Sequence, residues 1–456
     1  MAAVRVLREI QISPSLPLQP PQPLTFLDIM WLQNSQMVER LFFYHFPQPI
    51  SHFIDSKLPV FTESLSLTLR HYYLLAGSIR PSPDSVEQFE IVYTEGDSVN
   101  ITLSEFTGDD FRNISGHHPR SLKNLRLLVP KPAKSSTSGG QFPPISIQIT
   151  LFPNQGLCIG FAINHAVCDA AGSMRFIRSC AAACRSAAEP NLDDIYPPFL
   201  DRSIIIDTRG IRRKLFENMR QFKECCEEHL KKEDTMALSD LGYVSATFTL
   251  GEDQILRLKE RVQAKAMEQG TKPPSFHMSA FVVTCAFVWK CLVKARGYDG
   301  VISQRFGSPV DWRSRMRPPI PSNYFGNCLG FFMAELNFGD MVGKNGMELA
   351  AIEIRKSIDW LQGRDIGEVL IVATDRSGEV KKSRPLSVAG SPKLRVYEVD
   401  FGWGRPVKVE ITSTVETGAI SLAESREEEG GLEVGLVLSE EEMSKFGTNF
   451  SSGLTE

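Results

Sequence analysis

The sequence predicts a mixed α/β fold, of the α+β kind, built as two domains. The chain has 456 residues, which exceeds the size of most single domains. Segments with strand spacing and segments with helical spacing follow one another without the strict βα order of a parallel sheet. The pattern restarts after a polar stretch. We therefore expect an N-terminal domain in 1–190, a crossover linker in 191–240 and a C-terminal domain in 241–456.

Composition narrows the functional class. Hydrophobic residues make up 42% of the chain and charged residues 23%, the balance of a folded globular protein. The net charge of −4 disfavours binding to nucleic acid or to an anionic membrane. Nine cysteines without CxxC pairs indicate free thiols in a reducing compartment, and the N-terminus has no apolar signal segment. These features predict a cytosolic protein.

The N-terminal half opens with a predicted strand, Val4–Ile12. The proline-rich stretch 14–23 is expected to be a stiff connector, with a polyproline ligand for a partner domain as the alternative. Helical spacing predicts a helix over Ser56–Ala76 that ends at Gly77. Two further strands are expected at Gln88–Thr94 and Leu125–Val129.

A hairpin over Ile145–Ile163 is the clearest local prediction. Apolar and polar residues alternate in its first strand, and the turn residues Pro153–Gly156 follow. The return strand is almost entirely apolar, which is typical of a strand buried on both faces. It ends at His165, and a helix over Ala170–Ala188 comes next.

The polar middle and the C-terminal half continue in the same style. The expected elements are a charged helix at Ile211–Lys232, a strand at Val244–Leu250, a helix at Glu252–Met267, an apolar helix at Ser275–Ala295 capped by Ser275, strands at Val407–Ile411 and Leu432–Leu438, and a last helix whose start has capping-box spacing in Ser439–Glu442. The acidic run 424–429 is expected at a solvated hairpin tip.

His165 and Asp169 form the first candidate site. A neutral histidine at the end of a strand can accept a proton from an alcohol near neutral pH. Asp169 could orient this histidine or hold the turn by an ion pair. No third or fourth metal ligand lies nearby in the sequence, which disfavours a metal site. Cys168 as a nucleophile paired with His165 is a weaker alternative to a packed thiol.

Asp400-Phe401-Gly402-Trp403-Gly404 forms the second candidate. Two glycines around a tryptophan indicate a tight backbone path. An indole or backbone N–H there could face a developing oxyanion, whereas the alternative is a buried structural turn. No phosphate-binding glycine loop is present in the sequence.

Taken together, the two motifs resemble the signature of the plant BAHD acyl-CoA-dependent acyltransferases, H-x-x-x-D plus D-F-G-W-G. Further matches are spread along the chain at Leu24-Thr25-Phe26, Leu75-Ala76-Gly77, Pro197–Arg202 and Pro309-Val310-Asp311. Tyr324-Phe325-Gly326-Asn327-Cys328 and the segment 407–422 resemble the anthocyanin, flavonoid and phenolic glucoside malonyltransferases of that family. Ala170 departs from the glycine that many relatives carry.

The resemblance implies two similar chloramphenicol-acetyltransferase-like domains with a channel between them. His165 would be the general base and Trp403 the oxyanion region. Asp169 would pair with Arg313, or else with Arg315, and Asp400, Gly402 and Gly404 would be structural. Donor contacts are expected at Lys259, Ser275 and Ser279, with Arg175 or Arg178 near the malonyl carboxylate. No metal and no bound cofactor are implied, and malonyl-CoA would be a co-substrate.

The expected function is therefore transfer of a malonyl group from malonyl-CoA to a sugar hydroxyl, with the 6-position expected, of a phenolic or flavonoid glucoside. A hydroxycinnamoyl or acetyl donor is the alternative within the same chemistry. A hydrolase and a non-catalytic binding protein are alternatives of other classes. The resemblance also implies a monomer that binds small molecules rather than nucleic acid or membrane.

Overall fold

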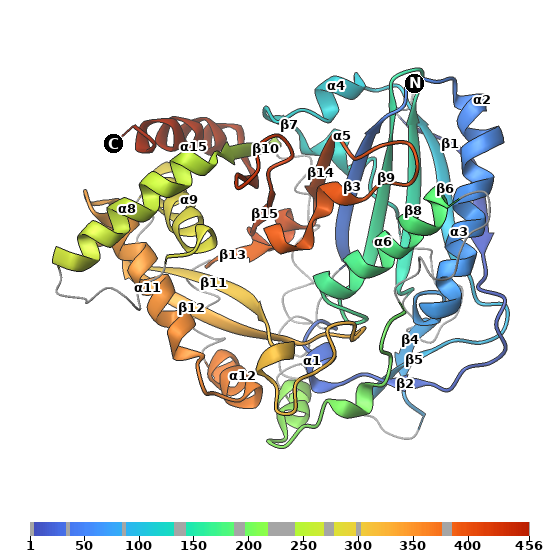
Figure 1. Ribbon diagram of the computed structural model, residues 1–456, viewed down its shortest axis with the longest axis horizontal. Coiled ribbons are helices and arrows are strands. Elements are labelled where there is room, and N and C mark those ends of the chain that lie inside the picture. Colours follow the sequence, from blue (N-terminus) through green and yellow to red (C-terminus); the bar gives the residue numbers. More distant parts are fainter. Residues whose placement is uncertain are drawn as a thin grey trace, which may run out of the picture.

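The computed structural model places two halves side by side, with the N-terminal half on the right of Figure 1 and most of the C-terminal half on the left. It describes residues 4–32, 37–83, 88–131, 143–186, 197–217, 242–268, 278–297, 302–375 and 385–455. Each half contains one large sheet with helices packed on it, so the predicted mixed α/β class is confirmed.

The sheet of the N-terminal half has six strands in the order β1-β6-β8-β9-β3-β14. Their bounds are β1 Val4–Ile12, β6 Val99–Phe106, β8 Ile145–Phe152, β9 Gly156–Asn164, β3 Met37–His45 and β14 Lys408–Ile411. All neighbours are antiparallel except β6 and β8. The predicted hairpin is confirmed as β8 and β9, whose residues are all buried. Helices α3 (Leu58–His71) and α6 (Ala170–Arg185) pack against each other beside this sheet (Figure 1).

The other large sheet has seven strands in the order β12-β11-β13-β15-β16-β10-β7. Their bounds are β12 Leu329–Asn337, β11 Ser303–Asp311, β13 Leu386–Ala389, β15 Ile420–Glu424, β16 Leu432–Ser439, β10 Tyr243–Leu250 and β7 Arg120–Ser121. The central helix α9 packs against its neighbours α8, α11 and α15. These four helices span α8 Glu252–Glu268, α9 Ala280–Arg296, α11 Gly346–Trp360 and α15 Glu440–Gly453.

A small third sheet and several short elements complete the described chain. The small sheet has the order β2-β5-β4. The bounds of the remaining elements are β2 Gln22–Pro23, β5 Phe89–Val92, β4 Ser78–Pro81, α1 Phe26–Ile29, α2 Ile50–His52, η1 Phe53–Lys57, η2 Tyr73–Leu75, α4 Phe111–Ile114, α5 Leu122–Arg126, η4 Arg202–Ile204, η6 Arg313–Arg315, α10 Phe338–Val342, α12 Ile366–Asp375, η7 Pro392–Leu394, η8 Val396–Glu398 and α14 Thr414–Thr417.

Each large sheet takes one strand from the other half of the chain. β14 pairs antiparallel with β3, and β7 pairs antiparallel with β10. The boundaries predicted at 190 and 240 remain a prediction, since the segments 187–196 and 218–241 lie outside the described residues. Whatever the boundary, these two strands tie the halves together by backbone pairing.

Four buried charges accompany this exchange, and we call Arg120, Lys408, Glu410 and Glu433 the exchange cluster. Arg120 on β7 pairs with Glu410 on β14, and Lys408 pairs with Glu433 on β16 at 3.2 Å. All four side chains are at most 4% exposed. Tyr397 donates to Glu433 at 2.6 Å. Two positive and two negative charges therefore face one another, and each cation has an anionic partner.

Several local predictions need correction. Leu125–Val129 is not a strand, because Leu122 and Leu125 bury the same side of the short helix α5. The helix predicted over Ser56–Ala76 is regular only as α3, flanked by the π turn η1 and the 3-10 turn η2. Gly77 does not end it as a left-handed cap. A Cβ at Gly77 would lie 2.2 Å from the carbonyl oxygen of Val92, so the glycine permits the approach of β5.

The C-terminal predictions fare similarly. Helix α9 begins at Ala280 with Ser279 as its N-cap, and Ser275 lies outside the described residues. Ser439 caps α15 by accepting from the Glu442 N–H at 3.2 Å, which confirms the predicted helix start. Of the charged helix predicted at Ile211–Lys232, only 211–217 is described, and this part is helical.

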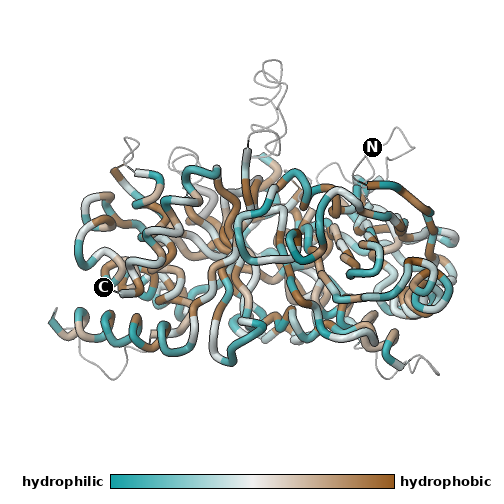
Figure 2. Tube along the Cα trace, turned by 90° about the horizontal axis from the view of Figure 1, so that it is seen from above, coloured by the Kyte–Doolittle hydropathy of each residue, from teal (hydrophilic) through white to brown (hydrophobic). Residues whose placement is uncertain are grey.

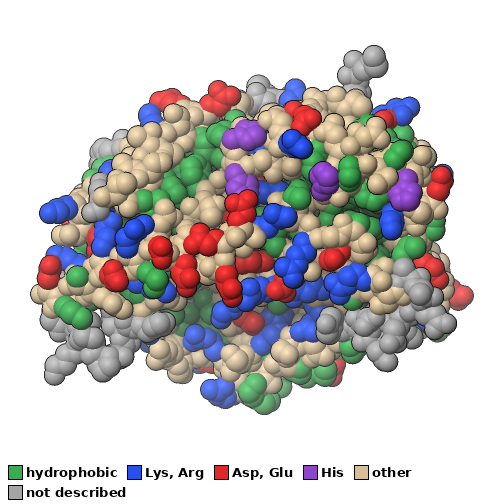
Figure 3. Space-filling model, turned by 45° about the horizontal axis from the view of Figure 1, so that its top comes forward, with side chains coloured by type: hydrophobic (Ala, Val, Ile, Leu, Met, Phe, Trp, Pro, Cys, Tyr) green, Lys and Arg blue, Asp and Glu red, His purple; other side chains and the backbone are tan. Residues whose placement is uncertain are grey.

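The surface and interior follow the composition. Figure 2 shows hydrophobic stretches running through the middle of both halves. On the face drawn in Figure 3, acidic and basic side chains lie interspersed. Within the described part of the chain, no helix combines the length and the apolar character needed to cross a membrane.

Candidate active site

His165 lies directly after β9, in a turn that the sequence itself specifies. The Asn164 side chain accepts from the Ala166 N–H at 3.0 Å, and the Val167 N–H donates to the Asn164 carbonyl at 3.0 Å. The imidazole is partly buried and stacks on the ring of Trp31, with 3.6 Å between centroids and 9° between planes. The turn and the stacking together fix where the imidazole lies.

Asn327 holds the other side of His165. Its Oδ1 lies 3.1 Å from His165 Nδ1, and its Nδ2 donates to the His165 carbonyl at 2.8 Å. Asn327 belongs to the Tyr324–Cys328 motif of the C-terminal half, whereas His165 belongs to the N-terminal half. Sequence reasoning treated this motif only as a subgroup marker and missed the contact.

Asp28 holds Asn327 in place through hydrogen bonds. Its Oδ1 accepts from both the backbone N–H and the Nδ2 of Asn327, each at 2.9 Å. Its Oδ2 accepts from Arg202 at 2.6 Å and from the Thr25 backbone and hydroxyl at 2.8 and 2.7 Å. Both Asp28 and Arg202 have fully buried side chains. No sequence pattern pointed to Asp28, although Thr25 and Arg202 lie in the matched segments Leu24–Phe26 and Pro197–Arg202.

The environment keeps His165 neutral near pH 7. Burial lowers its pKa from the ordinary value of 6.5, and this effect outweighs the opposite influence of Asp169, Asn327 and Asp28. Nε2 makes no hydrogen bond to any of the described residues, whereas Nδ1 faces Asn327. An unprotonated imidazole with one open nitrogen is suited to accept a proton.

Asp169 forms the predicted ion pair with Arg313. The Arg313 guanidinium approaches the two Asp169 oxygens at 3.0 and 2.8 Å, with both side chains at most 5% exposed. Burial opposes the charge, but Asp169 raises the pKa of Arg313 above its ordinary value. Asp169 also caps α6 through the Gly172 N–H and accepts from the Cys328 N–H. Arg315 instead lies over the ring of Trp312 at 5.3 Å, so it is not the partner.

Cys168 has no catalytic geometry. It is 2% exposed, and burial raises its pKa well above the ordinary value, so it carries its proton at neutral pH. All seven cysteines in the described part of the chain are buried and free. The packed-thiol interpretation is therefore favoured over a nucleophile.

The Asp400–Gly404 motif is a turn. Asp400 Oδ1 accepts from the Gly402 and Gly404 N–H groups at 2.7 and 3.0 Å, and both glycines have positive φ, +93° and +100°. Trp403 stacks on Phe401 and meets Tyr44 and Phe53 edge-on. None of these rings contacts His165. The oxyanion role of Trp403 stays a prediction that no contact here supports.

The expected donor contacts are dispersed. Lys259 is partly buried on α8. Ser279 is the N-cap of α9, and its hydroxyl accepts from the Val282 N–H at 3.3 Å. Arg175 donates to the Ser322 carbonyl at 3.2 Å, and Arg178 donates to the carbonyls of Leu394 and Arg395. These contacts involve neither His165 nor its hydrogen-bond partners, so the donor roles of these residues remain predictions.

Arg40 is the buried cation that sequence reasoning missed. It is 2% exposed on β3 and makes no hydrogen bond or ion pair with any described residue. Burial and, after it, the positive charge of Arg178 lower its pKa to about 10, against a weaker opposite effect of Cys168 and Glu424. The available signal was a charged residue directly before the apolar run 41–44, on the same face of the strand as Phe42 and Tyr44.

Arg40 also lies on the strand next to His165. Met37 pairs with Asn164, which precedes His165, and Arg40 pairs with Phe161, about 10 Å farther along the sheet. Side chains alternate along β3, so Arg40 shares a face with Phe42 and Tyr44, which belong to the core on the α6 side. An unpartnered buried cation at this distance is a candidate anion subsite.

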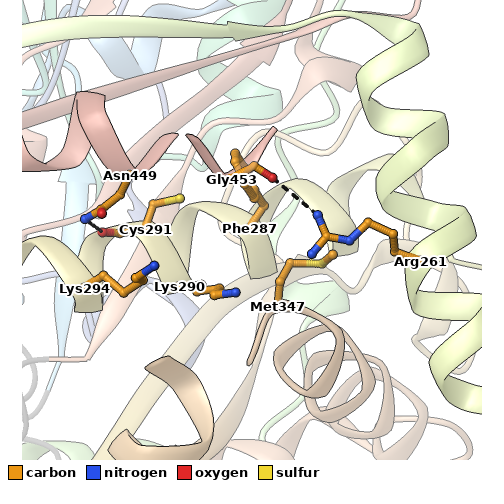
Figure 4. A pocket seen from close by; sticks show the side chains of 8 residues that line it. All are labelled: Arg261, Phe287, Lys290, Cys291, Lys294, Met347, Asn449 and Gly453. Atoms are coloured by element: carbon orange, nitrogen blue, oxygen red, sulfur yellow. Dashed lines mark hydrogen bonds between the residues drawn. The ribbon is translucent and has the colours of Figure 1, made fainter. Parts of the chain in front are cut away.

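A pocket elsewhere proves to be part of the packing of the C-terminal half. It lies among α8, α9, α11 and α15 (Figure 4), and its cavity volume is only about 10 Å³. Arg261 on its rim donates to the Gly453 carbonyl and pairs with Glu348, while Asn449 donates to the Cys291 carbonyl. Its lining contains neither His165 nor any motif residue. In the described part of the chain, no group of three or more His, Cys, Asp or Glu side chains is arranged to hold a metal ion.

Known proteins resemble this chain over nearly its whole length. The model described as the transferase family matches residues 2–452. Phenolic glucoside malonyltransferase 2 of Arabidopsis thaliana is 37% identical over 439 residues, which cover 95% of this chain and 94% of the relative. Malonyl-coenzyme A:anthocyanin 3-O-glucoside-6''-O-malonyltransferase of Dahlia pinnata is 34% identical over 448 residues, with 95% and 93% coverage.

Solved structures agree on the fold. Vinorine synthase superposes with a TM-score of 0.71 at 20% identity, covering 98% of each chain. This likeness confirms the predicted pair of chloramphenicol-acetyltransferase-like domains. The family match, the relatives and the intact His165 and Asp400 motifs lead to one conclusion: the chain belongs to the transferase family, that of the BAHD acyl-CoA-dependent acyltransferases.

Proposed function

We propose that this protein transfers a malonyl group from malonyl-CoA to a sugar hydroxyl, with the 6-position expected, of a phenolic or flavonoid glucoside. The names of the two malonyltransferase relatives support the donor and the acceptor class. The single observation in this chain that carries the donor assignment is Arg40, because malonyl differs from acetyl by a free carboxylate. A buried guanidinium without a partner is matched to that group.

The proposed mechanism uses His165 as a general base. Nε2 takes the proton from the sugar hydroxyl as its oxygen attacks the thioester carbonyl carbon. The tetrahedral intermediate then collapses, the C–S bond breaks, and CoA leaves as a thiolate that takes up a proton. The Asp169–Arg313 pair holds the turn that carries His165. Donor and acceptor would enter a channel between the two halves from opposite mouths.

Charge balance around Arg40 supports a carboxylate ligand. Arg178 adds a second positive charge nearby. Glu424 is the one acidic side chain among those that influence the pKa of Arg40, and it accepts from the Tyr397 N–H rather than from Arg40. Burial also raises the pKa of Glu424, which weakens it as a counter-ion. A malonyl carboxylate would give Arg40 an anionic partner.

Donor competition tests the assignment. Purified protein is incubated with a phenolic glucoside and equal amounts of malonyl-CoA and acetyl-CoA, and products are read by mass spectrometry. We expect malonyl product to dominate in the native chain. In Arg40→Met, kcat/KM for malonyl-CoA should fall about tenfold to a hundredfold, since a hydrogen bond to a charged group contributes roughly 1.5–3 kcal/mol. The value for acetyl-CoA should stay within about twofold.

The controls separate the alternatives. Arg175→Met tests the arginine that the sequence favoured, and Arg5→Met is a surface control on β1. Equal loss for both donors in Arg40→Met would contradict a carboxylate subsite. His165→Ala should reduce transfer of any acyl group by about 10²–10⁴. Product only from hydroxycinnamoyl-CoA or acetyl-CoA would overturn the assignment of malonyl-CoA as donor. Free malonate without acylated glucoside would indicate a hydrolase. No product from a broad panel of acyl-CoAs and glucosides would favour a binding protein.

We also propose a monomer in the cytosol that binds small molecules rather than nucleic acid or membrane. The free buried cysteines support a reducing compartment. Size-exclusion chromatography with light scattering tests the monomer, and a fluorescent fusion tests the location.

A further inference from the structure

We propose that Asn327 is a positioning residue that holds His165 in the tautomer with its proton on Nδ1, so that Nε2 is the basic nitrogen. A neutral imidazole carries one proton on either ring nitrogen, and only the bare nitrogen can act as the base. Which nitrogen is bare is therefore a condition for catalysis.

The orientation of the Asn327 amide follows from its other partners. Its NH₂ group has two protons, and both are used: one reaches Asp28 Oδ1 at 2.9 Å and the other reaches the His165 carbonyl at 2.8 Å. Both partners are acceptors only. The amide cannot be flipped without placing its oxygen against these two oxygens. Asn327 Oδ1 consequently faces His165 Nδ1, which must donate.

Asp28 makes this orientation firm because its own charge is held. Arg202 pairs with Asp28 in the fully buried interior, and the Thr25 backbone and hydroxyl also donate to Asp28. An ionised carboxylate cannot offer a proton to the amide. The chain of contacts thus runs from Arg202 through Asp28 and Asn327 to His165.

The contact crosses between the halves of the molecule. His165 and Asp28 come from the N-terminal half, whereas Asn327 follows β11 in the C-terminal half. The contribution of Asn327 to the tautomer is therefore made only when the halves are docked. The charged groups that act on the pKa of His165 are Asp169 and Asp28, and each is paired with an arginine. The His165 carbonyl also favours a proton on the ring.

This inference rests on the proposed role of His165 as the base but not on the identity of the donor. Nitrogen-15 NMR of histidine-labelled protein, without substrate, reads the protonation of Nδ1 and Nε2 directly. The His165 signals are assigned by their loss in His165→Ala. We expect protonated Nδ1 and bare Nε2 at pH 8. A native chain with its proton on Nε2 overturns the proposal, whatever any variant does.

Asn327→Ala tests the cause. We expect the His165 spectrum to show exchange between both tautomers and kcat to fall about tenfold to a hundredfold, less than the loss of the base itself, because the His165 carbonyl still favours Nδ1–H. KM for both substrates should change less than threefold. The acid limb of kcat/KM should move to lower pH, since the hydrogen bond to Asn327 raises the pKa of His165.

Asn323→Ala is the matched control. Asn323 also bonds to a segment outside the C-terminal half, the Pro197 carbonyl of the predicted crossover at 3.1 Å, but does not touch His165. It should keep the native tautomer and rate. An equal loss of rate in both variants, or an unchanged tautomer in folded Asn327→Ala, overturns the proposal. If Asn327→Ala does not fold, Asn327→Asp keeps an acceptor oxygen toward Nδ1, and Nε2–H in that variant counts against the proposal. Failure of malonyl transfer with the native tautomer intact would overturn only the donor assignment.

Discussion

The exchange cluster and the surroundings of Arg40 are both buried groups of charges, and they differ in balance. In the exchange cluster, Arg120 and Lys408 face Glu410 and Glu433, so positive and negative charges are equal in number. Around Arg40, burial raises the pKa of the nearby Glu424 carboxyl, and Arg40 has no hydrogen bond or ion pair with any described residue. Burying an unpaired charge is costly, so a fold that stabilises itself with ions pairs them. The unbalanced group is the one that a ligand would complete.

The largest expected effect is a loss of stability, and it compares an ion pair of the exchange cluster with the ion pair beside His165. Glu410→Ala leaves Arg120 without its buried carboxylate, and Asp169→Ala leaves Arg313 with only the exposed Asp311, so each should lower the free energy of unfolding by roughly 3–5 kcal/mol. Urea denaturation measures this loss. At a temperature where both variants stay folded, Glu410→Ala should keep its kcat, while Asp169→Ala should lose activity because the His165 turn is released. Equal kcat values in the two variants would contradict the distinction.

A smaller effect of opposite sign is expected for two matched arginine substitutions. Arg120→Met should destabilise the protein, because it leaves Glu410 buried without its arginine partner. Arg40→Met should leave the free energy of unfolding unchanged or raise it by roughly 1–2 kcal/mol, because it removes a buried charge that has no partner. Thermal unfolding of both variants, side by side, makes the comparison. Destabilisation by Arg40→Met equal to that by Arg120→Met would mean that Arg40 is structural.

The smallest effect is a dependence on pH. Burial lowers the pKa of His165 below 6.5, so the base stays neutral as the pH falls to 6.5 and is lost only below it. The acid limb of kcat/KM should therefore have its midpoint below pH 6.5. Burial and Lys408 also lower the pKa of His117, which is influenced by the exchange cluster. A lowered pKa gives stability that is present above 6.5 and disappears as pH falls through the folded pKa.

Kinetics and circular dichroism measured at the same pH values separate the two histidines. Activity that falls while the ellipticity is constant reports His165, whereas parallel loss reports unfolding. A midpoint for kcat/KM above 6.5 would contradict a neutral buried base.

The sequence pattern correctly predicted the elements that depend on only a few neighbouring residues. The hairpin of β8 and β9, helix α6 and the N-cap Ser439 were all expected, because alternation and capping act over a few residues. The error at Leu125 has the same origin, since five residues with two buried leucines fit a strand or a helical turn equally well.

The site was predicted only where a motif carried it. His165, Asp169 and Arg313 were found, and the last two are paired. Asp28 and Asn327 were missed because their role depends on three segments that meet only in the folded chain. The importance of Arg40 could have been predicted, since a charge at an inward position of an apolar strand is an anomaly that needs an explanation. The exchange of β7 and β14 could not be predicted, because pairing between distant segments leaves no local pattern in the sequence.

That exchange also has consequences for how such a chain can be made and recombined. On the ribosome, the N-terminal sheet remains without its edge strand β14 until the segment containing Glu410 has emerged, 290 residues after Arg120. A chimaera joined in the crossover would give each parent's sheet one foreign strand and would split Arg120 from its native Glu410. Crossing parents in this family should therefore transplant the strand around Lys408–Ile411 together with the N-terminal half, and β7 together with the C-terminal half. Each sheet then keeps its native strands, but Arg120 and Glu410 still come from different parents, so both parents must carry this pair.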